Sequence, residues 1–248
     1  MFKLVLSDID ILKNSIPIVS EIIDEANLVV DKSGISLLAP DRTMVSVVDL
    51  KILPTAFDSF DVSSDTALGL NMANLTAILK RVKSSDKLHL EYDSGKLVLK
   101  AVGRGVRTFS LPLIEVKSEK PPIDQLKFPV RIEVESSIIE EGIADAEVIG
   151  DSVFLEAEPS VFRMHAKGDV SSAHLELKQG DSGLLGVHAP ERAKSQYPLD
   201  YLKKMIKAAK LAPQTVVEFG KDYPMRLDFR QVDKLQMRFI LAPRVSEE

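Results

Sequence analysis

Short runs of alternating hydrophobic and polar residues recur along most of the chain, and they predict a protein built mainly of β-strands. In Phe2 to Leu6, Gly34 to Ala39 and Val161 to Ala166, every second side chain is apolar, which is typical of a strand with one buried face. Helical spacing of apolar residues is confined to a few short segments, such as Asn71 to Lys80. Many strands with a few short helices predict an α+β fold with antiparallel sheets.

The two halves of the chain repeat the same elements in the same order. Each half opens on a predicted strand, continues through a helix and further strands to a second helix, and ends in a hairpin and an apolar strand. Any α+β protein alternates such elements, but six matches at a nearly constant offset favour duplication over coincidence. The paired segments are Phe2 to Leu6 with Val130 to Val134, about Asp8 to Glu25 with about Ser136 to Ala146, Asn27 to Val30 with Ser152 to Ala157, Gly34 to Ala39 with Val161 to Ala166, Asn71 to Lys80 with Pro198 to Lys207, and the hairpin Leu88 to Val102 with Thr215 to Phe229.

A segment rich in proline and charge lies between the two halves. Glu115 to Pro122 and Lys127 to Pro129 together contain three prolines, which favour an extended connector over a helix or a central strand. We therefore predict a first domain at 1–114, a connector at 115–129 and a second domain at 130–248. Pro17 falls inside the first predicted helix, so we expect that helix to be kinked or to begin late, near Asn14 or Ser15.

The composition is that of an ordinary globular protein, and it excludes several kinds of structural and functional site that need cysteine. The chain has 248 residues, of which 45% are hydrophobic and 28% charged, and it has no cysteine. Disulfides, thiolate nucleophiles and cysteine-based zinc sites are thereby excluded. No apolar run has the length of a membrane span or of a secretory signal, so a cytoplasmic location is the expectation.

Positive charge is concentrated on the second predicted helix of each half, although the net charge of the chain is −5. Helical phasing places the lysines on a face opposite the apolar stripe, and one such face alone is usually just solvated. The same arrangement occurs twice in an otherwise acidic chain, which favours a surface that faces phosphates. Lysine supplies charge without a fixed bidentate geometry, which suits contacts that read no sequence. The candidate DNA-binding residues are Lys13, Lys80, Arg81, Lys83, Lys203, Lys207 and Lys210.

The first predicted helix of the second half departs from this pattern. Ser136 to Ala146 contains Glu140, Glu141 and Asp145 and no basic residue. We expect its surface to contribute little to the attraction of DNA.

Several segments resemble the proliferating cell nuclear antigen (PCNA) family, and the archaeal branch most of all. They are Leu38 to Leu50, Asn71 to Lys80, Gly168-Asp169 and Ile240 to Val245. The resemblance covers essentially the whole chain. It implies a DNA clamp fold with two topologically equivalent domains, antiparallel sheets outside and four helices inside, and a trimeric ring around double-stranded DNA. Lys13, Lys80 and Lys207 match the positions that face the hole most directly.

The resemblance also implies how the subunits and their partners meet. The last strand of the first domain, about Val106 to Val116, pairs in the family with an edge strand of the next subunit, here about Ser172 to Gln179, and this hides two sheet edges. A pocket beneath the connector takes a short docking motif. Its occupants in the family are DNA polymerase, flap endonuclease, DNA ligase and the clamp loader. The matching residues are Met44, Val45, Val47, Ile123, Leu126, Pro224, Ile240, Leu241, Ala242 and Pro243.

Three alternatives remain open from the sequence. The ring can contain three identical chains or different paralogous subunits, and a ring that recruits partners without encircling DNA needs no basic helices. A metal-dependent hydrolase could use Asp8 and Asp10, but a helix N-terminus explains these residues more simply. The chain lacks a phosphate loop, a nucleophile elbow and a paired-histidine helix, and we expect neither catalysis nor a metal or cofactor.

Overall fold

The structure is a computed structural model that describes residues 1–117 and 120–244. The chain separates into two compact units, each of which includes a short segment from the other half of the sequence. Unit 1 comprises Met1–Met44, Val48–Pro121 and Gln231–Met237, and unit 2 comprises Val45–Val47, Pro122–Arg230 and the chain from Arg238 onward. Ser118 and Glu119 of the predicted connector, and the last four residues of the predicted second domain, lie outside the described residues.

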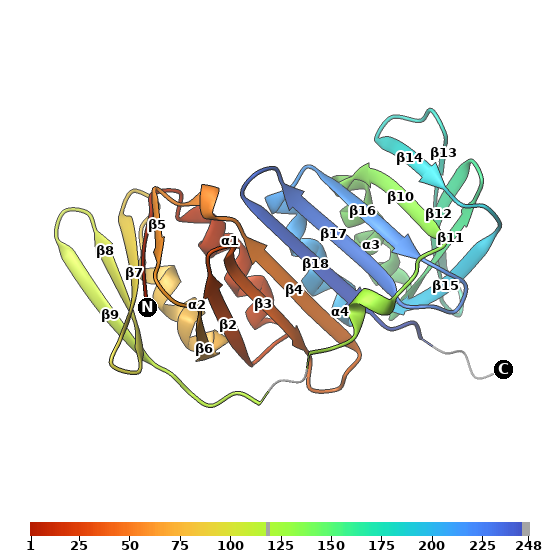
Figure 1. The fold of residues 1–248 in the computed structure, drawn as a ribbon. Coiled ribbons are helices and arrows are strands. Elements are labelled where there is room, and N and C mark those ends of the chain that lie inside the picture. Colours follow the sequence, from red (N-terminus) through yellow and green to blue (C-terminus); the bar gives the residue numbers. More distant parts are fainter. Residues whose placement is uncertain (118–119, 245–248) are drawn as a thin grey trace. The chain divides into compact units, whose positions relative to one another are not determined.

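The first half of the chain alternates strands with two α-helices (Figure 1). Its elements are β1 (Phe2–Leu6), α1 (Asp10–Ser20), β2 (Glu25–Asp31), β3 (Gly34–Pro40), β4 (Ser46–Ile52), η1 (Pro54–Ala56), β5 (Ser59–Val62), β6 (Thr66–Asn71), α2 (Met72–Arg81), β7 (Lys87–Asp93), β8 (Lys96–Val102) and β9 (Val106–Pro112).

The second half contains strands and α-helices in the same order. Its elements are η2 (Ile123–Gln125), β10 (Val130–Glu135), α3 (Ser136–Ile149), β11 (Ser152–Glu158), β12 (Val161–Lys167), β13 (Ser172–Lys178), β14 (Leu184–His188), β15 (Ala193–Pro198), α4 (Leu199–Met205), η3 (Ile206–Leu211), β16 (Gln214–Phe219), β17 (Met225–Gln231) and β18 (Leu235–Leu241).

The sheet topology confirms the predicted duplication. The strand order β5-β1-β7-β8-β9 is repeated as β14-β10-β16-β17-β18, and the order β4-β3-β2-β6 is repeated as β13-β12-β11-β15. The strands pair in antiparallel fashion, for example β1 with β5 and with β7. The α+β class with two equivalent domains is therefore confirmed.

Turn chemistry explains the hairpin between β7 and β8. Ser94 and Gly95 both have positive φ, at 47° and 79°, and they connect strands in which Asp93 pairs with Lys96. Positive φ at both central residues is the geometry of a two-residue turn whose twist matches that of the flanking strands. The sequence Asp-Ser-Gly therefore fixes this register.

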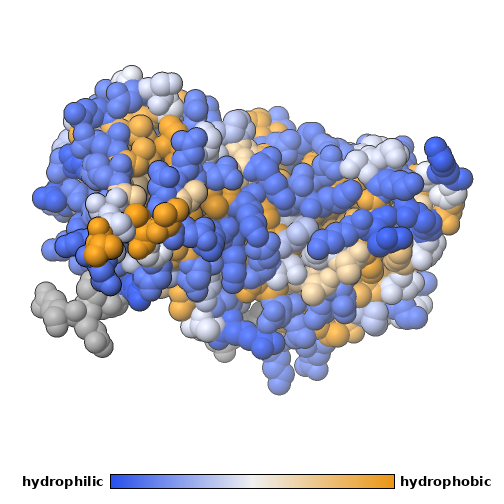
Figure 2. Space-filling view, turned by 180° about the vertical axis from the view of Figure 1, so that it is seen from behind, coloured by the Kyte–Doolittle hydropathy of each residue, from blue (hydrophilic) through white to orange (hydrophobic). Residues whose placement is uncertain are grey.

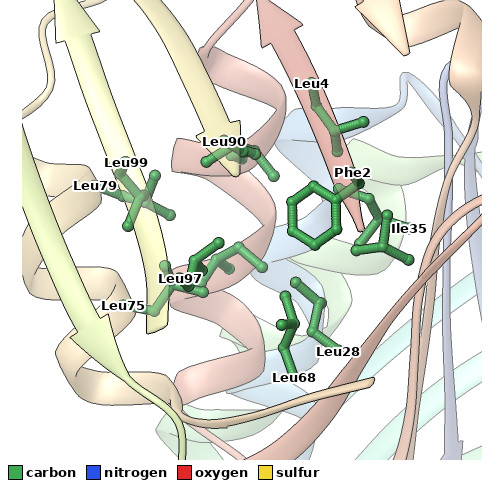
Figure 3. Close-up of a pocket in the computed structure, with 13 residues that line it drawn as sticks. Phe2, Leu4, Leu28, Ile35, Leu68, Leu75, Leu79, Leu90, Leu97 and Leu99 are labelled. Atoms are coloured by element: carbon green, nitrogen blue, oxygen red, sulfur yellow. The ribbon is translucent and has the colours of Figure 1, made fainter. Parts of the chain in front are cut away.

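The core of unit 1 lies between its strands and the α1–α2 pair. Side chains from both helices and from six strands point toward one another around a cavity of about 20 Å³ (Figure 3). Its lining is entirely apolar, so a water molecule there would have no hydrogen-bond partner. The lining residues are Phe2, Leu4, Leu12, Ile16, Leu28, Val30, Ile35, Leu68, Leu75, Leu79, Leu90, Leu97 and Leu99.

The first helix differs from its predicted course. The helix begins at Asp10 and ends at Ser20, with Pro17 inside it, so the late start expected near Asn14 or Ser15 is wrong. Pro17 lies in the second half of the helix, where it has no N–H to donate. Glu21 N–H closes the last turn on the carbonyl oxygens of Pro17 and Ile18.

The last predicted helix is the other departure. The α-helix stops at Met205 after seven residues, and Ile206–Leu211 continues as a 3₁₀ helix. Since a 3₁₀ helix has three residues per turn, the apolar stripe continues through Ala208, which is fully buried. No helix among the described residues is long and apolar enough to cross a membrane.

Candidate DNA and partner interfaces

Lys13 holds the two helices of unit 1 together. Its Nζ donates hydrogen bonds to the Val82 carbonyl oxygen at 2.9 Å and to Ser84 Oγ at 3.5 Å. Val82 is the C-terminal cap of α2, so the ammonium group lies at the negative end of that helix dipole. Lys13 is half-buried. Its ammonium group links α1 to the end of α2 and is also partly accessible at the surface.

The bounds of α2 place its basic residues at the C-terminal end of the helix. Asn71 Oδ1 accepts the Asn74 N–H at 3.0 Å and caps the N-terminus. Ten residues later the chain leaves the helix, so Lys80 and Arg81 fall in the last turn and Lys83 follows it. All three side chains are exposed, and cations are favourable at this end of a helix.

An ion pair fixes the loop that follows α2. The Asp86 carboxylate accepts hydrogen bonds from Lys83 N–H, at 3.0 Å, and from the Arg107 guanidinium. The Lys83 N–H, and then the positive charge of Arg107, hold the pKa of Asp86 below its ordinary value. Arg107 also donates to the Arg81 carbonyl oxygen at 2.8 Å. The start of β9 is thereby tied to the basic end of α2.

In unit 2 the predicted basic residues lie on α4 and η3. Lys203, Lys207 and Lys210 are exposed. Lys207 and Lys210 are three residues apart in the 3₁₀ segment, so they project from the same side. Lys203 forms an ion pair with Glu147 of α3. The neighbouring Lys204 is half-buried, and its Nζ lies 5.6 Å from the ring centre of Tyr201.

The predicted partner-binding residues differ in their accessibility. Val45, Val47, Ile123, Leu126, Pro224, Ala242 and Pro243 are half-buried and belong to unit 2. Ala242 N–H donates to the Val45 carbonyl oxygen at 2.9 Å, so these two segments lie side by side. Met44 is 71% exposed with φ of 59°. Ile240 is buried and Leu241 is fully buried, so the Leu241 side chain belongs to the core and offers no surface to a partner.

An aromatic cluster that the sequence reasoning missed anchors the end of the connector. The Phe128 and Tyr223 rings meet edge to face with centroids 5.8 Å apart, and the Arg226 guanidinium lies 4.9 Å from the Phe128 centroid. Arg226 also donates to Glu218 at 2.5 Å. Phe128 stands between Lys127 and Pro129, so an aromatic residue inside a proline-rich segment was the available signal.

The family resemblance implies that β9 and β13 pair between subunits, and both strands lie at the ends of sheets. β9 ends the order β5-β1-β7-β8-β9, and β13 ends the order β13-β12-β11-β15. Both show the same alternation of exposed and half-buried residues, with a single buried leucine, Leu111 and Leu177 respectively. Each edge therefore leaves one row of backbone groups unused within the sheets described.

The carboxylates once considered for metal binding have other contacts. Asp8 forms an ion pair with Lys234 at 2.7 Å, and Asp10 accepts a hydrogen bond from Ser84 at 2.8 Å. Within the described ranges, no group of three histidine or carboxylate side chains is arranged to hold a metal ion. Asp8 therefore pairs with Lys234 at the surface, and it does not cap α1, whose N-cap residue is Ile9.

The surface view agrees with a protein whose apolar residues are mostly buried. Hydrophilic residues dominate the face in Figure 2, and hydrophobic residues form separate patches. Val148 of α3 and Val170, after β12, are among the most exposed large apolar side chains, at 84% and 99%.

A duplicated unit of antiparallel sheets with paired helices, two free sheet edges and basic helix ends defines the clamp class of folds. Two family models cover almost the whole chain. The proliferating cell nuclear antigen N-terminal domain matches residues 1–115, and the C-terminal domain matches residues 122–244. The chain belongs to the proliferating cell nuclear antigen family, whose structures are trimeric rings.

Relatives in sequence and in structure agree with this assignment. The chain is 34% identical over 241 residues to a DNA polymerase sliding clamp of Nanoarchaeum equitans, covering 96% of this chain and 97% of that protein. It is 33% identical over 229 residues to the DNA polymerase sliding clamp of Pyrococcus abyssi, covering 92% of each.

Two solved structures cover 98% of the chain. PCNA from Thermococcus kodakaraensis has a TM-score of 0.91 at 27% identity and is covered completely. A chain of the PCNA2–PCNA3 complex from Sulfolobus tokodaii has a TM-score of 0.89 at 26% identity and is 99% covered. The archaeal resemblance deduced from the sequence is confirmed.

Proposed function

We propose that this chain is a subunit of a DNA sliding clamp, a trimeric ring that encircles double-stranded DNA and tethers DNA polymerase to it. The observation that carries the proposal is the match of both halves to the two domains of one clamp family. The exposed basic residues at the end of α2 and on η3 support it, because exposed lysines can attract phosphates without reading sequence.

The clamp acts by topology and needs no catalytic step of its own. A ring that stays on the duplex converts repeated encounters between an enzyme and its template into local ones at high effective concentration. We place the protein in the cytoplasm of an archaeal cell, with the chromosome. Flap endonuclease, DNA ligase and the clamp loader are proposed as further partners through the docking surface of unit 2.

The half-buried residues Ile123, Leu126 and Pro224 support such a surface. The aromatic cluster at Phe128 and Tyr223 supports it too, because it fixes the end of the connector that carries Ile123 and Leu126.

The proposed functional division is the one expected from the sequence, with domains at 1–114 and 130–248 joined by a connector at 115–129.

A subunit of a mixed ring is the second candidate. The structural likeness to a chain of a PCNA2–PCNA3 complex favours it, and so does the absence of basic residues from α3. The mass of the purified chain under native conditions distinguishes the two assemblies. A homotrimer has three times the 27.4 kDa of the chain, whereas a mixed-ring subunit reaches that size only with its paralogues.

Primer extension tests the proposed function. The ring, a clamp loader and DNA polymerase from the same cell are placed on primed circular DNA with a trap for released polymerase. The account predicts longer products per binding event when the ring and ATP are both present. Products of unchanged length, with a loader and polymerase active on another clamp, would refute the proposal.

A further inference from the structure

The acidic helix α3 packs in unit 2 beside the segment that carries the basic residues. α3 contacts both α4 and η3, and Figure 1 shows α3 and α4 within the same half of the chain's fold. Its buried residues include Ile139, Ile143 and Ala146, at helical spacing. Its exposed charged residues are all acidic, namely Glu140, Glu141, Asp145 and Glu147.

Helical geometry divides these carboxylates between two flanks of α3. Glu140 and Glu147 are seven residues apart, two helical turns, and therefore share a flank. Glu147 pairs with Lys203 of α4, and Glu140 lines a surface hollow together with Lys207 and Lys210. This flank faces the basic segment.

Glu141 and Asp145 lie toward the other flank. Gly142, next to Glu141, faces the side chains of Met164 and Leu175, which belong to β12 and β13. Helical geometry thus places Glu141 and Asp145 on a different side of α3 from Glu147 and its partner Lys203.

The Glu147–Lys203 pair is too exposed to serve mainly as a stabilising contact. The two side chains are 49% and 45% exposed, and ion pairs of this kind contribute little to folding stability. Their effect on surface charge is larger, because a lysine that is paired with a carboxylate presents no net charge to a phosphate.

Unit 1 lacks this arrangement. Among the described residues, no ion pair involves Lys80 or Arg81. The acidic residue of α1, Asp10, lies at the start of its helix and accepts a hydrogen bond from Ser84. The basic end of α2 therefore keeps its charge.

We propose that Glu147, supported by Glu140, withholds Lys203 from DNA, so that α4 of unit 2 attracts the duplex inside the ring less than the α2 residues of unit 1 do. The inference rests on the proposed clamp function and specifies how the two units of each subunit differ in this attraction. Glu147 acts as a positioning residue through Lys203.

A double-mutant cycle on the assembled ring tests the inference. Binding of a short linear duplex is measured over a series of salt concentrations for the wild type, Glu147→Gln, Lys203→Gln and the double variant. Glu147→Gln is expected to tighten binding several-fold at low salt and to steepen the dependence of log K on log salt, by up to about 0.9 for one more neutralised phosphate. Lys203→Gln is expected to weaken binding more in the Glu147→Gln ring than in the wild type.

Two controls distinguish the effect of the Glu147–Lys203 pair on DNA binding from the effect of net charge and from dissociation of the ring. Asp61→Asn removes one exposed carboxylate from β5 and is expected to leave the affinity nearly unchanged. Lys80→Gln is expected to weaken binding in every background, and native mass confirms that each variant still assembles.

Equal effects of Glu147→Gln and Asp61→Asn would overturn the inference, as would a Lys203→Gln effect that does not depend on residue 147. Failure of the clamp function has a different signature, in which the wild-type ring is not retained on circular DNA and Lys80→Gln changes nothing.

Discussion

At the scale of single residues, apolar side chains at alternate strand positions hold the chain together, and some polar side chains make specific contacts. Leu99 illustrates the first, because it is fully buried and lines the cavity between β8 and the α1–α2 pair. His165 illustrates the second, because its imidazole stacks on Phe154 with centroids 4.9 Å apart and planes at 13°.

Leu99→Ala should lower the free energy of unfolding by about 2–5 kcal/mol, since it removes buried methyl groups and enlarges an existing cavity. Denaturant titration of the chain measures the loss. Val232→Ala, at a side chain that is 78% exposed, is the matched control and should change the value by less than about 0.5 kcal/mol. Equal losses at both sites would contradict the packing described for unit 1.

His165 should make unit 2 sensitive to acid. Burial, and then the charge of Lys194, lower the pKa of His165 below its ordinary value of 6.5, while Glu156 opposes the shift. The unfolded chain therefore takes up the proton first as the pH falls below about 6.5, and the folded state loses stability in that interval. His174 on β13 and Arg163 on β12 also face the imidazole of His165, and their positive charges disfavour its protonation.

Unfolding titrations between pH 8 and 5 check this effect. The difference in stability between the wild type and His165→Gln should be constant above about pH 6.5 and should shift against the wild type below it. A difference that stays flat across the whole range would show that burial does not control this histidine.

At the scale of elements, the edge strands β9 and β13 are the segments expected to pair between subunits. Hydrogen bonds from Leu113 N–H to Gly95 O and from Gly103 N–H to Gly105 O mark the bonded pairs of the β8–β9 ladder. With Leu99 opposite Phe109 in that register, the odd-numbered residues of β9 bond to β8. Thr108 therefore directs its N–H and C=O away from β8.

Thr108→Pro should leave unit 1 folded and weaken the ring. The substitution removes an outward N–H and no bond of the β8–β9 ladder, and proline is tolerated on edge strands. Native mass at decreasing concentration should show dissociation of the variant where the wild type stays assembled. Thr108→Ala keeps the N–H and should behave like the wild type, and a stable Thr108→Pro ring would exclude pairing through this edge.

The element scale also shows what could be predicted from the sequence. Many strands and both hairpins were predicted closely, because alternation and the turn residues Ser94 and Gly95 are local signals. The strands β4, β5, β6, β14 and β15 were not predicted. The change from α4 to η3 was not predicted, because the lysines and alanines of this segment permit either kind of helix. The aromatic cluster at Phe128 and the pairing of Lys203 with Glu147 depend on residues far apart in the sequence.

At the scale of the whole molecule, the chain consists of two equivalent units. Two equivalent units per chain allow three chains to close a ring from six similar parts. Helix composition then differentiates the parts, because α2 ends in basic residues whereas α3 exposes carboxylates. A clamp needs this non-specific attraction to be modest, since its hold on DNA comes from closure of the ring rather than from affinity.

Retention on circular DNA tests the central claim most directly. The protein is loaded onto nicked circular DNA by a clamp loader with ATP, free protein is removed, and the DNA-bound fraction is followed before and after a single cut that linearises the circle. The account predicts long retention on the circle and rapid loss from the linear form, at a salt concentration where binding to free linear DNA is weak. Equal rates of loss from circular and linear DNA would contradict it.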